Sequence, residues 1–303
     1  MLLDTPSLYF RAFHGIPQTV TAPDGTPSGA VRGLLDFIAR LLRDHRPTHL
    51  VACMDADWRP AWRVAALPSY KAHRVAGDGE EQVPTALEPQ VDAVEEVLDA
   101  LGLARIGVAG YEADDVIGTL ATAAERPVDV VTGDRDLFQL VDDERGVRVL
   151  YTAARGVGRC EVMDEAAVHA RYGIPGRAYA DFALLRGDPS DGLPGVPGVG
   201  ERTAAALITR FGSLQAILTA LEEGTSDGFP AGSRARLDAA RAYLAAAPVV
   251  VRVALDAPLP AYDDALPQQP AGPERLVQLS DRWGLDGPVN RVLAALTDVA
   301  GAA

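Results

Sequence analysis

Nine acidic residues in the first two thirds of the chain follow apolar runs or lie in tight turns, where their side chains can converge. They are Asp4, Asp55, Glu112, Asp114, Asp115, Asp134, Asp136, Asp188 and Asp191. Neighbouring acids recur at i, i+2 past a strand end or at i, i+3 within one turn, spacings that let them point at one object. Any single member could cap a helix or solvate a loop. Nine of them in matching contexts favour one shared site.

The chemistry of these side chains indicates hard divalent cations. Carboxylates that lie close together disfavour one another's ionisation, and a divalent ion removes that conflict. Because the motifs contain no histidine or cysteine, we expect Mg²⁺ or Mn²⁺ rather than zinc. The number of acids exceeds what one ion needs, so we expect two or more ions. That arrangement serves in-line displacement at phosphorus, and the pattern therefore predicts phosphodiester hydrolysis.

A basic segment follows the acid at the end of the second apolar run. Residues 58–77 contain Arg59, Arg63, Lys71 and Arg74 and no acid, and Lys71 is the only lysine in the chain. Such a run is usually a solvated face. Its place directly after Asp55 favours a role beside the carboxylates.

A glycine-rich turn, LPGVPGVGERTAAAL at residues 193–207, precedes a helical pattern. Gly195, Gly198 and Gly200 permit a tight turn whose N–H groups can bind phosphate, and its carbonyls could hold a monovalent cation. The glycine spacing is neither the dinucleotide-binding pattern nor a Walker loop, which excludes kinase and dehydrogenase chemistry. Between two helices, the turn resembles a helix-hairpin-helix grip on the DNA backbone.

The elements that must position these residues alternate between strand and helix in the first half of the chain. Strand-like apolar runs lie at 2–4, 48–55, 127–134 and 147–152. Amphipathic helical patterns lie between them, at 30–45 and 88–102. This alternation predicts an α/β domain with a mostly parallel sheet, whose strands carry chemistry at their carboxyl ends. From about residue 171, short helical patterns replace the strands, up to a proline-rich connector at 257–273. We expect the helical segment that closes the chain to pack back on the body.

Composition limits the classes of protein that fit. The chain has 303 residues, 48% of them hydrophobic, and 28 basic against 42 acidic residues give a formal charge of −14. This charge argues against coating nucleic acid or an anionic membrane by bulk attraction. Cys53 and Cys160 form no zinc or redox spacing, and the N-terminus lacks the basic region of a signal peptide. We expect a cytoplasmic, monomeric protein without a membrane span.

Together the motifs resemble the 5′-nuclease (flap endonuclease) family, in particular the bacterial 5′→3′ exonuclease domain found at the front of DNA polymerase I and as stand-alone proteins. The matching stretches, in the family's order over about residues 2–212, are LLDTPSLYFRAF, MDAD, SYKAHR, GYEADDVIGTLA, TGDRDLFQL and GDPSDGLPGVPGVGERTA. From VRVALDAPLP onward the resemblance is looser.

The resemblance implies an α/β, PIN-like, mostly parallel sheet flanked by helices, with a helical arch at residues 58–84. It places the catalytic domain at residues 1–170. Residues 171–303 then form a helical region with a helix-hairpin-helix type DNA-binding motif and the C-terminal tail. The arch admits a single-stranded 5′ end, while the hairpin at 193–200 holds the duplex behind it.

The resemblance also implies roles for individual residues. The nine acids are the metal-site carboxylates, and Lys71 and Arg74 match two cations that reach the scissile phosphate, so that Lys71, Arg74 and Asp134 are the catalytic set. Arg63 matches a basic residue of the arch. The implied DNA contacts are Phe10, Arg11, Arg63, Lys71, Arg74, Gly195, Gly198 and Gly200.

The expected substrates are DNA with 5′ single-strand flaps, overhangs, nicks or gaps, cut with Mg²⁺ or Mn²⁺ in two or more copies. A monovalent cation such as K⁺ is expected at the hairpin. Because no polymerase follows, we expect the chain to act in trans beside a DNA polymerase and a ligase. Two residues depart from the family pattern: Phe10 replaces a tyrosine, and Gly192 replaces an asparagine, which is expected to loosen the loop that presents Asp191.

Three alternatives stay open from sequence. A PIN-type ribonuclease shares the carboxylate core, but the basic arch and the hairpin argue against it. An inactive junction-DNA-binding module would be expected to have lost metal carboxylates. An acidic protein binding structural Ca²⁺ would be stabilised by calcium and would not cleave DNA with Mg²⁺ or Mn²⁺.

Overall fold

A six-stranded sheet in the order β3-β2-β1-β4-β5-β6 forms the centre of the computed structural model, which describes residues 1–77, 81–225 and 227–301. The strands are β1 (Leu2–Asp4), β2 (Val51–Cys53), β3 (Ala104–Ile106), β4 (Val128–Thr132), β5 (Val147–Tyr151) and β6 (Glu161–Met163). Strands β1 to β5 pair in parallel, and β6 pairs antiparallel with β5. The predicted mostly parallel sheet is confirmed. Strands β3 and β6 were not predicted, because a charged residue, Arg105 in β3 and Glu161 in β6, leaves neither with an apolar run.

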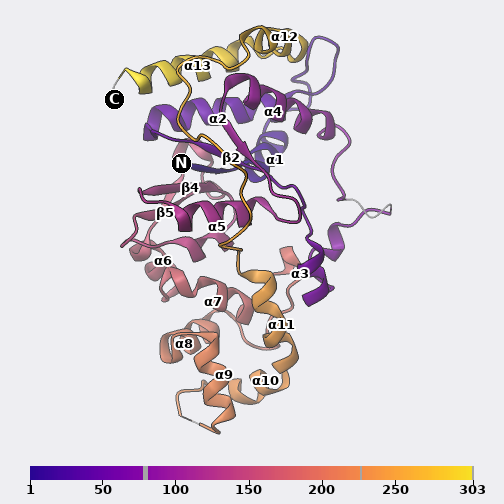
Figure 1. Ribbon diagram of the computed structural model, residues 1–303. Coiled ribbons are helices and arrows are strands. Elements are labelled where there is room, and N and C mark those ends of the chain that lie inside the picture. Colours follow the sequence, from indigo (N-terminus) through magenta and orange to yellow (C-terminus); the bar gives the residue numbers. More distant parts are fainter. Residues whose placement is uncertain (78–80, 226, 302–303) are drawn as a thin grey trace.

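Successive strand residues face two separate layers of helices (Figure 1). Leu3 and Val131 pack in the core that includes α2, whereas Leu2 and Val130 pack in the core that includes α5. This alternation is the two-residue period of a strand buried on both faces. The first layer contains α1 (Thr5–Gly15), α2 (Gly29–His45), α4 (Glu88–Leu101) and the short η3 (Val157–Arg159). The second contains α5 (Ala113–Ala123), η2 (Asp136–Leu140), α6 (Glu165–Tyr172) and η4 (Gly176–Ala178).

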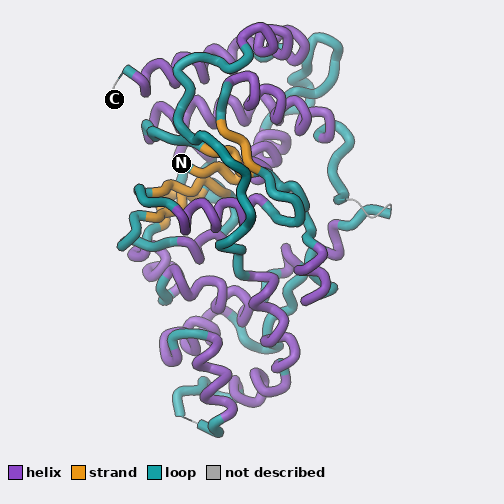
Figure 2. The backbone as a smooth tube through the Cα atoms, in the orientation of Figure 1, coloured by secondary structure: helices purple, strands orange, loops and turns teal. Residues whose placement is uncertain are grey.

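A helical region lies beyond the second layer, in the lower part of Figures 1 and 2. Its elements are α7 (Tyr179–Arg186), η5 (Pro189–Asp191), α8 (Glu201–Phe211), α9 (Leu214–Glu222), α10 (Ser233–Ala239) and α11 (Arg241–Val251). Among the described residues, no single helix is long and apolar enough to cross a membrane. Helices α8 and α9 meet that criterion only as a pair, which is bent by 78°.

The segment after β2 leaves the sheet and projects from the body (Figure 1). In its described part the predicted helical arch, 58–84, contains the short helices α3 (Ala61–Ala66) and η1 (Ala72–Arg74). Val75 and Glu81 then form an isolated antiparallel bridge. The predicted arch also includes residues 78–80, which lie outside the described residues.

The end of the chain returns to the sheet domain. The proline-rich connector runs alongside β2, where Leu50 N donates to Asp264 O at 2.9 Å. Helices α12 (Pro273–Trp283) and α13 (Asp286–Ala300) then pack on α4 and α2, at the opposite end of the molecule from α9 (Figure 1). The closing segment of the region 171–303 thus packs back on the body, as expected from the sequence.

Candidate active site

A pocket of about 350 Å³ opens where β1, β2 and β4 end. Six of the nine predicted carboxylates line it: Asp4, Asp55, Glu112, Asp114, Asp134 and Asp188. Parallel strands end at the same edge of a sheet, so residues distant in sequence meet there. The structure therefore brings most of the predicted acids together without any histidine or cysteine in the lining.

Asp4 shows how the fold holds one of these acids in a fixed orientation. It is the last residue of β1 and the N-cap of α1, and it accepts from Ser7 N at 3.1 Å and from Thr132 Oγ1 at 2.5 Å. Its side chain is buried, and burial together with the nearby charge of Asp134 raises its pKa to about 6. Ionising a carboxylate in this environment is costly, and a bound cation would lower that cost. The raised pKa of Asp4 therefore indicates a cation site.

Crowding of negative charge extends through the rest of the cluster. Burial raises the pKa of Asp114 well above its ordinary value, and the charges of Asp4 and Asp134 add to the rise. Burial raises the pKa of Asp136 in the same way, with Asp134 as the largest charge acting on it. Asp136 Oδ1 is also buried without a hydrogen-bond partner among the described residues. Such an orphaned oxygen is a costly group that a divalent cation would satisfy.

Three of the predicted ligands lie outside the pocket lining. Asp115 is fully buried and bound through both oxygens by Arg63, at 2.7 and 2.6 Å. Asp136 lies behind Asp134, and the backbone N–H of Asp136 donates to Asp134 Oδ1 at 2.8 Å. Asp191 accepts from Arg74 Nη2 at 3.0 Å. Among the described residues, no three acidic, histidine or cysteine side chains form a ready-made metal cage.

Glu112 is the most heavily bonded acid at the pocket. Its carboxylate accepts from the hydroxyl of Tyr70 at 2.9 and 2.8 Å and forms ion pairs with Lys71 and Arg63. Burial opposes the charge of Lys71, but the charges of Glu112, Asp191 and Asp55 together outweigh burial and raise the pKa of Lys71. Lys71 is therefore a cation at the pocket, where it was predicted.

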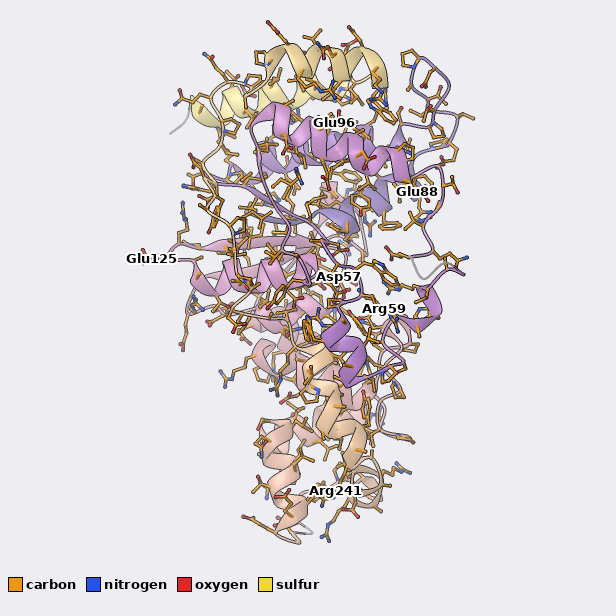
Figure 3. All side chains as sticks on the ribbon, turned by 45° about the vertical axis from the view of Figure 1, so that its right-hand side comes forward. Asp57, Arg59, Glu88, Glu96, Glu125 and Arg241 are labelled. Atoms are coloured by element: carbon orange, nitrogen blue, oxygen red, sulfur yellow. The ribbon has the colours of Figure 1, made fainter. Side chains whose placement is uncertain are left out.

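Arg59, the first cation of the basic segment, is bonded within that segment. Its Nε donates to Tyr70 O at 2.6 Å, and its Nη2 donates to Pro68 O at 3.0 Å. Figure 3 shows Arg59 close to Asp57, whose Oδ1 accepts from Arg59 N at 3.1 Å. Arg59 therefore holds the backbone that leads to Lys71.

Sequence analysis gave Arg63 a contact with DNA, whereas the structure buries it. Its side chain is 2% exposed and is enclosed by Glu112, Asp115 and backbone carbonyls. A guanidinium in that position cannot reach a DNA backbone on the surface. The sequence signal was misleading because a basic run beside acids fits an internal ion pair as well as a phosphate contact.

Arg74 and the loop around Asp191 form one assembly with the segment that carries Lys71. Arg74 Nη2 donates to Ser190 O at 2.6 Å, and Lys71 N donates to Asp191 O at 3.0 Å. Lys71 has a left-handed backbone, with a φ of +46°. This loop therefore fixes the backbone of Lys71 and the side chain of Arg74, the two predicted catalytic cations.

Phe10 and Arg11 lie on α1 close to the pocket. Phe10 is half-buried, lines the pocket, and has its ring centroid 5.3 Å from that of Tyr9. The Arg11 guanidinium lies near Gly133, the residue that follows β4. Both predicted DNA contacts are thus placed at or beside the pocket, with an aromatic face and a cation available there.

The glycine turn between α7 and α8 has the conformation that its sequence predicts. Gly195 and Gly198 have φ values of +68° and +77°. A Cβ at Gly195 would lie 2.6 Å from the backbone of Arg186, so the turn packs against the end of α7. Gly200 caps α8. The Gly198 carbonyl accepts from Arg236 Nη1 at 2.8 Å, a contact that sequence analysis did not foresee.

Sequence analysis missed several residues at the site, among them Glu81 in the pocket lining. Two of the missed residues lie inside motifs quoted above. Tyr70 in SYKAHR bonds Glu112, and Arg135 in TGDRD donates to Asp188 Oδ2 at 2.8 Å. Arg135 lines the pocket and is 40% exposed. The signal available was position: each lies next to a predicted site residue.

Comparison with known proteins supports the family resemblance of the sequence. The model of the 5′-3′ exonuclease N-terminal resolvase-like domain matches residues 1–173, and that of the 5′-3′ exonuclease C-terminal SAM fold matches 174–274. A 5′-3′ exonuclease of Streptomyces coelicolor is 62% identical over 98% of this chain and 100% of its own length. One of Mycobacterium tuberculosis is 50% identical over 99% and 98%. The DNA polymerase I of that species is 42% identical over 93% of this chain but only 30% of its own length.

Solved structures share the fold at low sequence identity. The T5 D15 protein co-crystallised with metal ions has a TM-score of 0.63 at 16% identity, covering 100% of this chain and 98% of its own. The catalytic core of Rad2 in complex with DNA substrate has a TM-score of 0.58 at 16% identity, covering 98% and 91%.

Proposed function

The chain belongs to the 5′-3′ exonuclease family, and on that premise we propose that it is a structure-specific 5′ nuclease. It hydrolyses DNA phosphodiesters near junctions between duplex and 5′ single strand, as a flap endonuclease and 5′-3′ exonuclease. The observation that carries this proposal is the pocket itself. Seven carboxylates, the six predicted acids and Glu81, line it together with Lys71 and Arg74, in a chain whose hairpin can hold a duplex.

The donor set fits two or more Mg²⁺ or Mn²⁺ ions, because it offers only oxygen and leaves Asp136 Oδ1 without a donor among the described residues. The residues that would hold them are Asp4, Asp55, Glu112, Asp114, Asp134 and Asp188 in the pocket lining, with Asp136 directly behind. When bound, such ions activate water and neutralise the phosphate oxygens. Asp115 and Asp191 lie outside the pocket lining and are bound by arginines, so we assign them to holding the site together.

The other residues bind and orient the substrate. Lys71 and Arg74 supply positive charge to the phosphate that is cut, and Phe10 offers a ring on which a base can stack. The turn at 193–200 presents backbone groups to the duplex phosphates, so that shape rather than base sequence determines the site of cleavage. Its carbonyls are where K⁺ would bind. The protein acts in the cytoplasm, beside a polymerase and a ligase.

A labelled 5′-flap DNA tests the proposal. Asp134→Asn should reduce cleavage by about 10³-fold or more with Mg²⁺, because a carboxylate at the centre of the pocket is lost. The matched control is Asp129→Asn on β4, the strand that leads to Asp134, where the acid pairs with Arg148 away from the pocket. The product should carry a 5′-phosphate. Near-normal cleavage by the Asp134 variant would refute the site, and equal cleavage of an RNA flap of the same shape would favour a ribonuclease.

A further inference from the structure

Arg63 touches the pocket acids and the helical region at once. On one side it binds Glu112 and both oxygens of Asp115 at the start of α5. On the other, its Nε donates to Val250 O at 3.1 Å and its Nη2 to Arg252 O at 3.4 Å, at the end of α11. Helix α3, which carries Arg63, packs against α11 (Figure 1).

The end of α11 is a firm anchor for this contact. Ala254 N donates to Asp115 Oδ1 at 2.7 Å, so the same carboxylate holds both Arg63 and the chain beyond α11. The Gln139 side chain donates to Val251 O and accepts from Val253 N, each at 3.1 Å. We call residues 250–257 the strap, because they tie the helical region to α5 and η2.

The strap is connected to the glycine turn through packed helices. Tyr243 on α11 donates its hydroxyl to Leu184 O on α7 at 2.8 Å. The neighbouring Leu185 O accepts from Val196 N, inside the turn, at 3.0 Å. A displacement of the turn would therefore be transmitted through α7 and α11 to the carbonyls that bind Arg63.

The chemistry of arginine suits this position. Its planar guanidinium carries five donors, which here serve two carboxylates and two carbonyls. Burial opposes its charge, but Glu112 and Asp115 outweigh burial and raise its pKa, so it stays charged. A lysine would keep the positive charge, but its single ammonium group could not bind the carboxylates and the carbonyls at the same time.

We propose that Arg63 is a positioning residue that couples duplex binding at the helical region to the orientation of Glu112, and so to divalent-cation binding in the pocket. This rests on the proposed function, because it assigns the turn to duplex and the pocket to metal. Arg63 itself touches neither DNA nor the cation. Its role is to make the two binding events favour each other.

The test compares the Mn²⁺ affinity of the full-length protein with and without a short blunt duplex. A titration of the same duplex in EDTA gives the duplex affinity without metal. In the wild type, the duplex should raise Mn²⁺ affinity by about fivefold or more, the lower end of ordinary coupling between sites. Arg63→Lys should bring that ratio close to one and change duplex affinity in EDTA by less than about twofold, since no DNA contact is lost.

Two further variants keep the test decisive. Gln139→Leu loosens the strap without touching a carboxylate, and it should also lower the ratio, even if Arg63→Lys does not fold. Arg105→Lys, at a surface ion pair with Asp99 on the first domain, is the matched control and should leave the ratio unchanged.

Three outcomes overturn the proposal: a wild-type ratio of one, a ratio unchanged in both Arg63→Lys and Gln139→Leu, or a large loss of duplex affinity in EDTA for Arg63→Lys. The last would make Arg63 a DNA-binding residue. Failure of the wild type to cleave a 5′ flap would instead refute the proposed function, and these binding ratios do not depend on cleavage.

Discussion

Replacing Gly192 with alanine should separate the loop at 188–192 from the segment that carries Lys71 and Arg74. Gly192 has a φ of +72°, and a Cβ added there would lie 2.1 Å from Ser69 O. Contacts of this kind are essentially never closer than 3.0 Å, so the two backbones must part by about 1 Å. The family resemblance led us to expect that glycine here loosens the loop. The structure shows the reverse, because only glycine lets the loop dock this closely.

The expected cost follows from the contacts across this interface. Ser69 Oγ donates to Gly192 O at 2.8 Å, and Lys71 N donates to Asp191 O at 3.0 Å. A separation of about 1 Å breaks both, at about 1 kcal/mol each. The left-handed backbone adds about 1 kcal/mol for alanine. Gly192→Ala should therefore lose about 3 kcal/mol of stability, and a catalytic cation displaced by about 1 Å should cost about 10²-fold in cleavage.

The assay is single-turnover cleavage of a 5′ flap, with urea denaturation of the same samples. Gly173→Ala is the matched control, because Gly173 has a φ of +71° with nothing within 4 Å of an added Cβ. It should lose only about 1 kcal/mol and cleave normally. Gly192→Asn should be as impaired as Gly192→Ala, since asparagine tolerates the backbone but not the clash. Cleavage by Gly192→Ala equal to that of the control would refute the close docking.

The remaining predictions concern pH and salt. The pKa of Asp4 is raised to about 6, so the native state binds a proton at Asp4 more tightly than the unfolded state does. The stability gained from this proton is complete below the ordinary pKa of an aspartate and is lost as pH rises through 6. In EDTA, Asp4 should therefore make the protein about 1 kcal/mol more stable to urea at pH 5 than at pH 8. Asp4→Asn should remove that difference. The same pH dependence of stability in the variant would contradict the raised pKa of Asp4. Binding of duplex DNA should weaken steeply as salt rises, because phosphate contacts dominate. A flat salt dependence by fluorescence anisotropy would contradict the backbone grip.

The sequence predicted the sheet and most of the pocket because both depend on local patterns. Apolar runs ending in acids located β1, β2 and β4, and parallel strands necessarily bring those ends together. Individual partners could not be predicted in this way. Whether Arg63 meets a phosphate or a carboxylate depends on how α3 packs against α11, a contact between residues 187 positions apart for Val250.

The close docking at Gly192 also lay beyond sequence reasoning. A glycine in a loop indicates freedom of the backbone, but it does not say whether that freedom serves flexibility or a close approach. The answer required the position of Ser69, which belongs to a segment 123 residues earlier. The return of the closing helices to the body was expected, but their partners α4 and α2 were not, because an amphipathic helix shows an apolar face without naming what it packs against.

The formal charge of −14 describes poorly the surface that DNA approaches. The acids at the pocket differ in depth: Asp4, Glu112 and Asp188 are each no more than 5% exposed, whereas Asp114 and Asp134 are half-buried and Asp55 is exposed. Arg74 and Arg135 are more accessible, with 35% and 40% of their side chains exposed. A phosphate arriving from solvent therefore finds accessible cations in the pocket lining, beside the acids. Exposed charges more than about 10 Å apart are screened from one another at ordinary salt. The arrangement of charges at the pocket therefore matters more to an approaching phosphate than the net charge of the protein. An acidic protein can thus attract DNA at the one place where its carboxylates are needed for cutting it.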